Sequence, residues 1–451
     1  MGCVNGFRDD GLESAGMKWD CRVMPDTAPR PIRAAVLLGL AAQALFTLRL
    51  ATPHKLMFDE VHYVPAARVL LKLSGPVNIE HPLLAKELIA LGITIFGDNS
   101  FGWRILSTFA GTATVLGIFA ILWMLFGRTR TAVMGALFVL LNITVFIQAR
   151  IAMLDGFMAA FVVTGIAALL WAMRSTPGKA WQRWLLGSVL LGLGVACKWV
   201  AAPYIAYAGI AFLAIRLRDA RARNRSVYAA LNPGDQIFWP GMPAIHALLA
   251  LGVVSIAAYC LTFLPAFFYA VQPMTVHGFV RFQREMYAAQ TEILPPHTYQ
   301  SGWRTWPLMI RPIWYLYEPV DGAVRGVLMI GNPAILWGGL IAVAACLLAW
   351  VREGSMKLLA VVLLWAGSWA MWALIPKSIG FFYYYYLPSI FLALPLAAAF
   401  DRFGTGKYRH WEEGFLILAF GLFVYFYPII SAVALNDPQD FRYWMWFPTW
   451  P

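Results

Sequence analysis

The sequence predicts an all-α integral membrane protein that crosses the bilayer many times. Of its 451 residues, 60% are hydrophobic and only 13% are charged, whereas a soluble domain is roughly half apolar and roughly a quarter charged. Several apolar runs reach the ~20 residues that a helix needs to cross the hydrocarbon core of a bilayer. These runs do not alternate between apolar and polar residues, so they do not match the strands of a membrane β-barrel.

The apolar runs indicate about eleven transmembrane helices. We place them at residues 32–50, 102–126, 131–149, 155–173, 184–201, 203–217, 244–271, 325–350, 357–375, 381–400 and 413–432. Residues 1–31 are then expected to form a cytoplasmic N-terminal tail, residues 32–432 a single transmembrane domain, and residues 433–451 an outer C-terminal tail. The mixed charge of the first tail does not match a cleaved signal peptide.

Short basic clusters between the apolar runs give the orientation. They lie at residues 128–130, 174–183, 216–225, 352–357 and 402–409, all on one side of the membrane if there are eleven spans. Lys and Arg in short loops mark the cytoplasmic side, so we expect a multi-pass protein of the cell membrane with its C-terminus outside. Orientation therefore accounts for much of the net charge of +12, and nothing points to nucleic acid as a partner.

Two long connections, at about 51–101 and 272–324, are expected on the outer side. Loops of this length in a compact protein are usually functional. Each holds amphipathic stretches that we expect to lie as helices in the membrane interface. One is predicted to open at Pro65, a second at Pro82, and a third to cover residues 280–290.

The first outer connection carries an acidic pair, Asp59-Glu60, directly after the first predicted span. Adjacent carboxylates are unusual in a chain with so few charges. Low-dielectric surroundings raise the pKa of a carboxylate towards the range that suits a general base. The pair is therefore a candidate catalytic site, and a solvated acidic turn is the alternative.

Four further charges lie at the outer ends of predicted spans: Arg104, Arg150, Asp155 and Lys198. Ionisable residues at membrane depth are costly and are functional by default. Cations and carboxylates gathered on the outer face suit binding of a phosphate from the lipid phase while a carboxylate activates an acceptor. The structural alternative is ion pairing for packing, for instance of Arg150 with Asp155.

Three other groups of residues are candidates, each with a plainer explanation. His81 and Lys86 lie at the start of the second interfacial helix and could hold a phosphate, or could serve as a helix cap and a Lys that extends to the interface. The aromatic and Arg-rich segment 297–312 could bind a sugar face and its phosphate, and the hydroxyls of the tyrosines of 383–386 could line a cavity. For both, an interfacial belt is the alternative. The histidines at 54, 62 and 81 match no zinc-ligand spacing, so we predict no metal ligand set.

In their order along the chain, these residues resemble the motifs of the protein O-mannosyltransferase family, membrane enzymes of the GT-C fold. The likeness covers nearly the whole chain from about residue 34. It includes Phe58-Asp59-Glu60, His81-Pro82-Leu83-Leu84-Ala85-Lys86, Arg104, Arg150 with Leu154-Asp155, Cys197-Lys198-Trp199, His297 to Pro307 with Arg311-Pro312, Gly331-Asn332-Pro333-Ala334 and the Tyr-rich run before Pro388. The chain differs at Leu83, where the family often has a second proline, and only about fifty residues occupy the place where eukaryotic members insert a β-trefoil domain. It therefore looks like a bacterial member.

The resemblance implies transfer of mannose from polyprenyl-phosphate mannose to Ser or Thr hydroxyls of exported proteins, with inversion at the anomeric carbon. Asp59 would be the general base, and Glu60 would orient the acceptor or pair with a cation. Arg104 and Lys198, followed by Lys86 and Arg150, would bind the donor phosphate. His81, Asp155 and Tyr385 would support them, with Asp155 holding Arg150 or another cation. No cofactor is implied, and the sequence leaves open whether a divalent metal assists.

Two other functions are compatible with parts of the pattern. Another GT-C transferase, such as an aminoarabinose transferase that acts on lipid A, also has an outer Asp and a prenyl-phosphate donor. A transporter or flippase would place its charges near mid-span and show repeat symmetry. Neither of those features is evident in the sequence.

Overall fold

The computed structural model describes residues 31–232, 234 and 236–451, and almost all of the predicted N-terminal tail lies outside them. Within that part of the chain, nine helical segments are long and apolar enough to cross a membrane. They contain α4 (Ser100–Phe126), α7 (Leu154–Met173), α8 (Pro177–Cys197), α9 (Ala202–Ala222), α11 (Ala244–Leu261), α13 (Pro333–Glu353), α14 (Met356–Ala370), α15 (Tyr386–Phe391) with α16 (Ala393–Phe403), and α17 (Trp411–Ile430).

Two shorter apolar helices account for the other predicted spans. The helix α1 (Ile32–Thr47) has 16 residues and α5 (Thr129–Leu140) has 12. The predicted span 131–149 is interrupted after α5, because Asn142 caps a separate short helix, α6 (Ile143–Gln148), by accepting a hydrogen bond from the Thr144 N–H. The helical membrane fold is confirmed, and the number of eleven spans stays a prediction.

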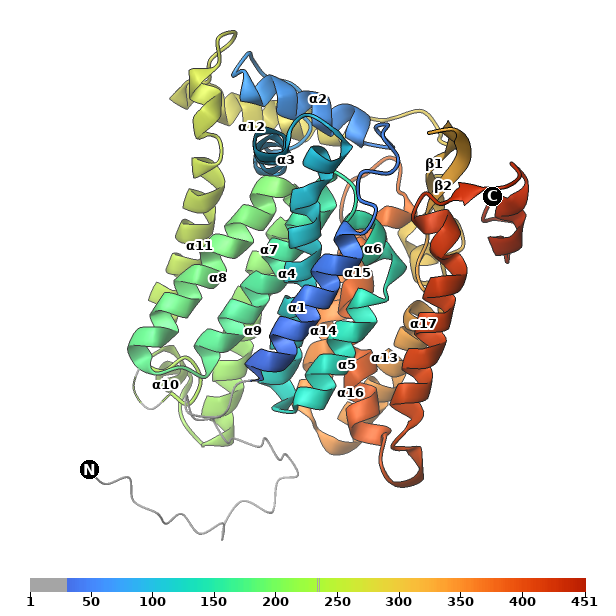
Figure 1. The fold of residues 1–451 in the computed structure, drawn as a ribbon. Coiled ribbons are helices and arrows are strands. Elements are labelled where there is room, and N and C mark those ends of the chain that lie inside the picture. Colours follow the sequence, from blue (N-terminus) through green and yellow to red (C-terminus); the bar gives the residue numbers. More distant parts are fainter. Residues whose placement is uncertain (1–30, 233, 235) are drawn as a thin grey trace.

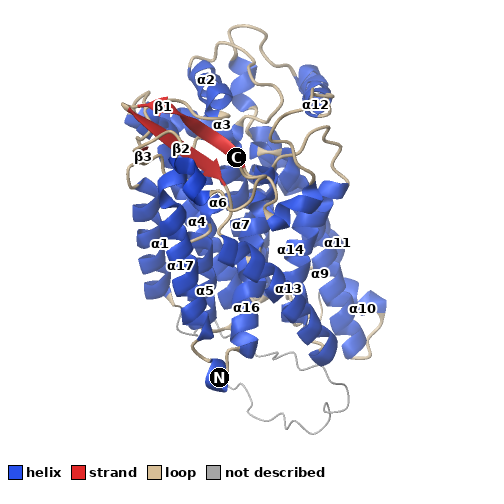
Figure 2. Ribbon diagram, turned by 90° about the vertical axis from the view of Figure 1, so that its right-hand side faces the viewer, coloured by secondary structure: helices blue, strands red, loops and turns tan. Residues whose placement is uncertain are grey.

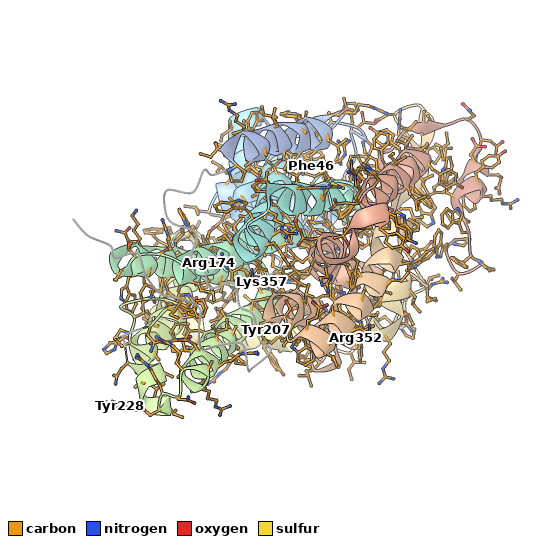
Figure 3. The ribbon with its side chains drawn as sticks, turned by 90° about the horizontal axis from the view of Figure 1, so that it is seen from below. Phe46, Arg174, Tyr207, Tyr228, Arg352 and Lys357 are labelled. Atoms are coloured by element: carbon orange, nitrogen blue, oxygen red, sulfur yellow. The ribbon has the colours of Figure 1, made fainter. Side chains whose placement is uncertain are left out.

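The helices form a bundle with two different ends (Figure 1). At the end where α1 begins lie the basic connections, including the short helix α10 (Val227–Leu231). Arg174 follows α7, and Arg352 and Lys357 lie at the end of α13 and the start of α14, at the end of the bundle that Figure 3 shows from below. We call it the basic end. The opposite end, the site end, carries both of the long connections.

Three helices lie over the site end: α2 (Glu60–Leu71), α3 (Leu84–Phe96) and α12 (Val276–Gln290) (Figure 1). The predictions of helices after Pro82 and over 280–290 are confirmed. The prediction that Pro65 opens a helix is wrong, because α2 begins five residues earlier and Pro65 lies inside it. The helix therefore starts directly at the acidic pair.

A small sheet lies beside these helices (Figure 2). Strands β1 (Ile313–Val320) and β2 (Ala323–Met329) form an antiparallel hairpin, and β3 (Ala434–Leu435) pairs with β2. The predicted span 325–350 thus began too early, since its first five residues belong to β2 and α13 starts at Pro333. The C-terminal segment packs at the same end, where the fully buried Trp450 donates its indole N–H to the Met309 carbonyl at 2.8 Å.

Candidate active site

The geometry around Asp59 begins with the backbone of the residue before it. Phe58 has a φ of +49°, in the left-handed region that a bulky residue rarely adopts. Its ring is held by a stacked contact with Tyr315, at 4.0 Å between ring centroids, and by an edge contact with Tyr383 at 5.5 Å. Such strain at a single residue is typical of functional sites, and it sets the direction in which Asp59 leaves the chain.

Asp59 stands at the position just before the first residue of α2, yet its side chain does not cap that helix. Burial raises the pKa of its carboxyl to about 6, and the nearby Asp155 acts in the same direction while Lys198 and His62 act against it. The Tyr63 hydroxyl donates to Asp59 Oδ2 over a long 3.5 Å. The carboxylate is therefore available to a substrate, with a pKa suited to accepting a proton near neutral pH.

Lys198 is the cation that the structure brings to this carboxylate. Its Nζ lies 2.9 Å from both carboxylate oxygens of Asp155, and 5.5 and 5.4 Å from the ring centroids of Tyr383 and Tyr384. Burial lowers the pKa of Lys198, but Asp155 and Asp59 are among the groups that raise it, and the net shift is upward. Because two carboxylate oxygens occupy at most two of its three N–H donors, an ammonium here can still bind an anion.

The prediction that Asp155 holds a cation is confirmed, and the cation is Lys198. The alternative of an Arg150–Asp155 pair is wrong. A hollow beside Asp155 is lined by Tyr384, Trp372 and Pro388 among others. His81 belongs to the same region: its ring lies 6.0 Å from that of Tyr63, and its Nδ1 is 2.9 Å from the amide nitrogen of Gln290 on α12.

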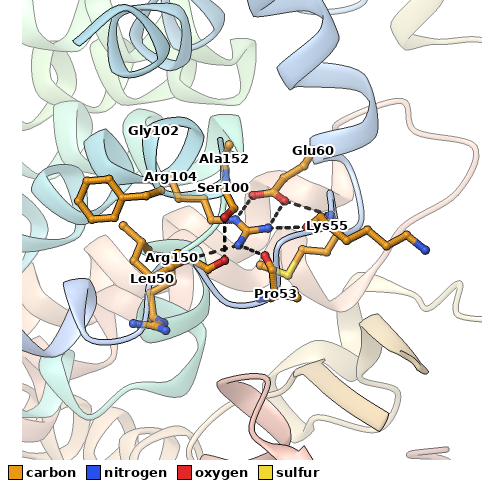
Figure 4. A network of polar contacts seen from close by, with 12 residues as sticks. Leu50, Pro53, Lys55, Glu60, Ser100, Gly102, Arg104, Arg150 and Ala152 are labelled. Atoms are coloured by element: carbon orange, nitrogen blue, oxygen red, sulfur yellow. Dashed lines mark hydrogen bonds and ion pairs between the residues drawn. The ribbon is translucent and has the colours of Figure 1, made fainter. Parts of the chain in front are cut away.

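Glu60 and Arg104 form a separate, fully buried ion pair behind the site (Figure 4). Arg104 donates to both carboxylate oxygens of Glu60 at 2.7 Å. Its remaining N–H groups bind the carbonyls of Leu50, Pro53 and Lys55. All five donors of the guanidinium are thus engaged, and none is left for the donor phosphate that the sequence predicted.

Glu60 also accepts hydrogen bonds from the backbone of two other segments. The Met57 N–H donates at 3.0 Å and the Ala152 N–H at 2.9 Å. The pair therefore ties the chain that precedes Asp59 to the start of α4 and to the connection before α7. Of the two roles predicted for Glu60, the structure shows the cation pair.

Two other predicted phosphate ligands are likewise occupied by backbone carbonyls. Arg150, 6% exposed, donates to the carbonyls of Phe46 and Leu48 at the end of α1. Lys86 is fully buried and donates to Asn78 and to the carbonyl of His81. Burial lowers the pKa of Lys86 to about 7. These two side chains shape the loops around the site.

Tyr385 is not placed where its predicted supporting role requires. Its hydroxyl accepts a hydrogen bond from the Trp365 indole at 2.9 Å, within the helix packing. The preceding residues Tyr383 and Tyr384 face Lys198 instead. Sequence reasoning identified the tyrosine run but missed which members reach the site, and it missed the hydroxyl of Tyr63, which lies one helical turn after Asp59.

Two models of one known protein family match this chain. A family model described as dolichyl-phosphate-mannose-protein mannosyltransferase matches residues 80–233. A second, described as the C-terminal four-TMM region of protein O-mannosyltransferase, matches residues 275–450. The chain belongs to the protein O-mannosyltransferase family. The two models together cover most of the described residues, including Lys198 and Tyr384, while Asp59 lies before the first matched range.

Curated members of this family are similar over most of their length. The polyprenol-phosphate-mannose–protein mannosyltransferase of Mycobacterium tuberculosis is 26% identical, over 87% of this chain and 86% of that protein. That of Mycolicibacterium smegmatis is 24% identical, over 92% of each. An undecaprenyl phosphate-aminoarabinose arabinosyl transferase of Pseudomonas fluorescens is 32% identical over only 37% of this chain and 29% of its own length.

Solved structures share the fold. The Saccharomyces cerevisiae protein O-mannosyltransferase Pmt1-Pmt2 complex bound to the sugar donor aligns with a TM-score of 0.80, at 14% identity, over 97% of this chain and 95% of that one. ArnT from Cupriavidus metallidurans aligns with a TM-score of 0.56, at 14% identity, over 92% and 68% of the two chains. At these identities the likeness shows the GT-C fold alone.

Proposed function

We propose that this protein transfers mannose from polyprenyl-phosphate mannose to Ser or Thr hydroxyls of exported proteins. The observation that carries the proposal is a carboxylate with a raised pKa, Asp59, beside an ion-paired ammonium, Lys198, in a chain of the protein O-mannosyltransferase family. The names of the mycobacterial relatives support the donor and the acceptor.

In the proposed reaction, Asp59 accepts the proton of the acceptor hydroxyl as its oxygen attacks C1 of mannose. The new bond forms between that oxygen and C1, and the bond between C1 and the phosphate oxygen breaks. The electron pair of the broken bond leaves with the polyprenyl phosphate. One displacement with one base inverts the configuration at C1 and needs no covalent enzyme intermediate.

Lys198 is the proposed phosphate ligand. An ammonium held 2.9 Å from both oxygens of Asp155 is fixed in place before the donor arrives, and it stabilises the negative charge that develops on the leaving phosphate. Arg104, Arg150 and Lys86 are assigned positioning roles, because they bind carbonyls or carboxylates of the chain itself.

Replacing Lys198 by Met is expected to weaken donor binding. Loss of one charge-assisted contact costs about 1.5–3 kcal/mol, so the donor Kd should rise on the order of 10- to 100-fold in titrations of purified protein. The single variant also leaves Asp155 buried without its cation, which lowers stability. The double variant Lys198→Met, Asp155→Asn removes both charges and should regain stability but not donor affinity. Recovery of donor affinity in the double variant would assign Lys198 a purely structural role. The control is Lys72→Met, because Lys72 is an exposed Lys at the end of α2.

The pH dependence should follow the ionisation of Asp59. Its pKa is raised to about 6, and the base acts only when it is deprotonated. The value of kcat/KM should therefore rise with pH through about 6 and change roughly tenfold per pH unit well below that value. Transfer rates to a Ser/Thr peptide, measured from pH 4.5 to 8 with stability checked at each point, test this. A profile that is flat between pH 5 and 7 would contradict it.

The site is proposed to face the outside of the cell membrane, because the basic end carries the Lys and Arg clusters that mark the cytoplasmic side. Gly178 and Gly302 are exposed, at the basic end and the site end, and a Cβ at either meets no atom within 4 Å. Cysteine variants at these positions, in a chain whose own cysteines are replaced, report the orientation. A membrane-impermeant maleimide should label position 302 in intact cells and position 178 only after lysis. The reverse result would contradict the orientation.

A donor screen tests the function. Membranes containing the wild type should transfer radiolabelled mannose from polyprenyl-phosphate mannose to a Ser/Thr-rich peptide. A second candidate is an aminoarabinose transferase, favoured by the partial match to the Pseudomonas protein. Transfer from the aminoarabinose donor to lipid A, without transfer of mannose to peptide, would replace the proposed function by this one.

A further inference from the structure

An open groove runs between the segment before α2 and strand β1. Its volume is about 350 Å³. One wall is formed by residues 55–58 with Val61, and the other by five consecutive residues of β1, 314–318. Side chains alternate between the two faces of a strand, so a groove lined by five residues in a row follows the edge of the strand.

That edge of β1 is unpaired. The sheet order is β1-β2-β3, which places β1 at an edge (Figure 2). Among the described residues, backbone hydrogen bonds join β1 to β2 but to no other segment. The free N–H and C=O groups of an edge strand are a template for an extended chain. The register shift between Trp314 and Leu316 marks an irregularity beside Tyr315, at the end of the groove nearest Phe58.

One end of the groove lies at the residue that precedes the proposed base in the chain. Phe58 lines it and is bonded directly to Asp59, and its ring stacks on Tyr315. Towards the other end, Lys55 pairs with Glu318 at 2.8 Å. These two contacts hold the walls at a fixed spacing, with aromatic rings near Asp59 and a neutralised charge pair away from it. The walls therefore offer backbone and aromatic contacts rather than a net charge.

We propose that this groove holds the acceptor polypeptide as an added strand along the free edge of β1, so that one Ser or Thr hydroxyl reaches Asp59. The proposal rests on the proposed function. Backbone pairing recognises any extended segment whatever its side chains, so acceptors are selected by extended conformation and by a hydroxyl at the position next to Phe58.

The first test uses wild-type protein and backbone-methylated peptides. An eight-residue Ser-containing peptide is compared with two N-methylated versions of itself. In each version two residues of one set are methylated, and the two sets are the residues whose N–H groups point to opposite sides of an extended strand. In an extended strand only one set points its N–H groups to the edge of β1. Methylation of that set should raise the acceptor KM roughly tenfold or more, because two hydrogen bonds are lost, and methylation of the other set should leave it nearly unchanged. Equal effects of both sets, or none, would overturn the proposal.

The second test fills the groove. Val61 lines it and is 49% exposed, so Val61→Trp should raise the acceptor KM of the peptide at least severalfold while leaving the donor KM unchanged. Val276→Trp, on the exposed face of α12, is the matched control. An unchanged peptide KM in Val61→Trp would contradict the proposal. A single Ser with blocked termini is too short to pair with β1. If wild type transfers mannose to it and to the peptide with equal KM, the groove proposal fails while the proposed function stands. If wild type transfers mannose to no hydroxyl at all, the proposed function itself fails.

Discussion

Replacing Asp59 by Asn is expected to abolish mannose transfer while leaving the folded protein intact. The amide has nearly the same size as the carboxylate but cannot accept the hydroxyl proton. Proton transfer by a positioned base contributes typically 10²–10⁴-fold to a rate, so kcat should fall at least about 100-fold in transfer assays on purified protein. Donor binding should be nearly unaffected, because Lys198 and Asp155 remain paired.

A measurement of stability distinguishes loss of the catalytic base from a folding defect in this variant. Burial raises the pKa of Asp59 to about 6, so at pH 7 the carboxylate is mostly ionised and its buried charge lowers the stability of the folded protein. The neutral amide removes that penalty, so the Asn variant should unfold no more readily than wild type. Asp98→Asn is the control, because Asp98 is an exposed carboxylate paired with Arg68. Full activity in Asp59→Asn would remove Asp59 as the base.

Replacing Arg104 by Met is expected to destabilise the protein severely and to stop transfer as a consequence. The variant leaves the carboxylate of Glu60 buried without a cation, with three carbonyls also losing their donor. Removing one partner of a buried pair costs about 3–5 kcal/mol. Equilibrium unfolding in mixed micelles should show a loss of this size, and Glu60→Gln should lose stability too.

The exposed pair Arg68–Asp98 provides the comparison for Arg104. Its side chains are 38% and 46% exposed, and those of the Arg104–Glu60 pair are 0% exposed. Exposed pairs contribute at most about 1 kcal/mol, so Arg68→Met should stay close to wild type in both stability and activity. If Arg104→Met unfolds like wild type but fails to bind donor, the guanidinium would be a phosphate ligand as the sequence first indicated.

The sequence predicted the membrane helices because a bilayer-spanning segment is determined largely by length and composition. The hairpin was missed because residues 326–330 carry no polar side chain and run on towards the apolar start of α13. Asn332 and Pro333 were the available signals, as a side-chain cap and a first-turn proline that together mark a helix start.

The sequence also predicted part of the candidate site. Asp59, Asp155 and Lys198 stand out as charges at the ends of apolar runs, and the structure brings them together. The partners of Arg104 could not be deduced, because its carboxylate lies 44 positions earlier and its carbonyls come from an irregular segment. Tyr384 was missed in favour of Tyr385 because a short 3-10 turn, and not an α-helix, sets which ring faces Lys198.

The anomeric configuration of the transferred sugar tests the central claim most directly. Purified protein is given polyprenyl-phosphate mannose of known configuration and a Ser/Thr peptide, and the one-bond C1–H coupling of the product is measured by NMR. A single displacement with Asp59 as the only base predicts that the configuration at C1 is inverted relative to the donor. Mannose attached to the peptide with retained configuration would require a second nucleophilic step and would contradict the proposed mechanism.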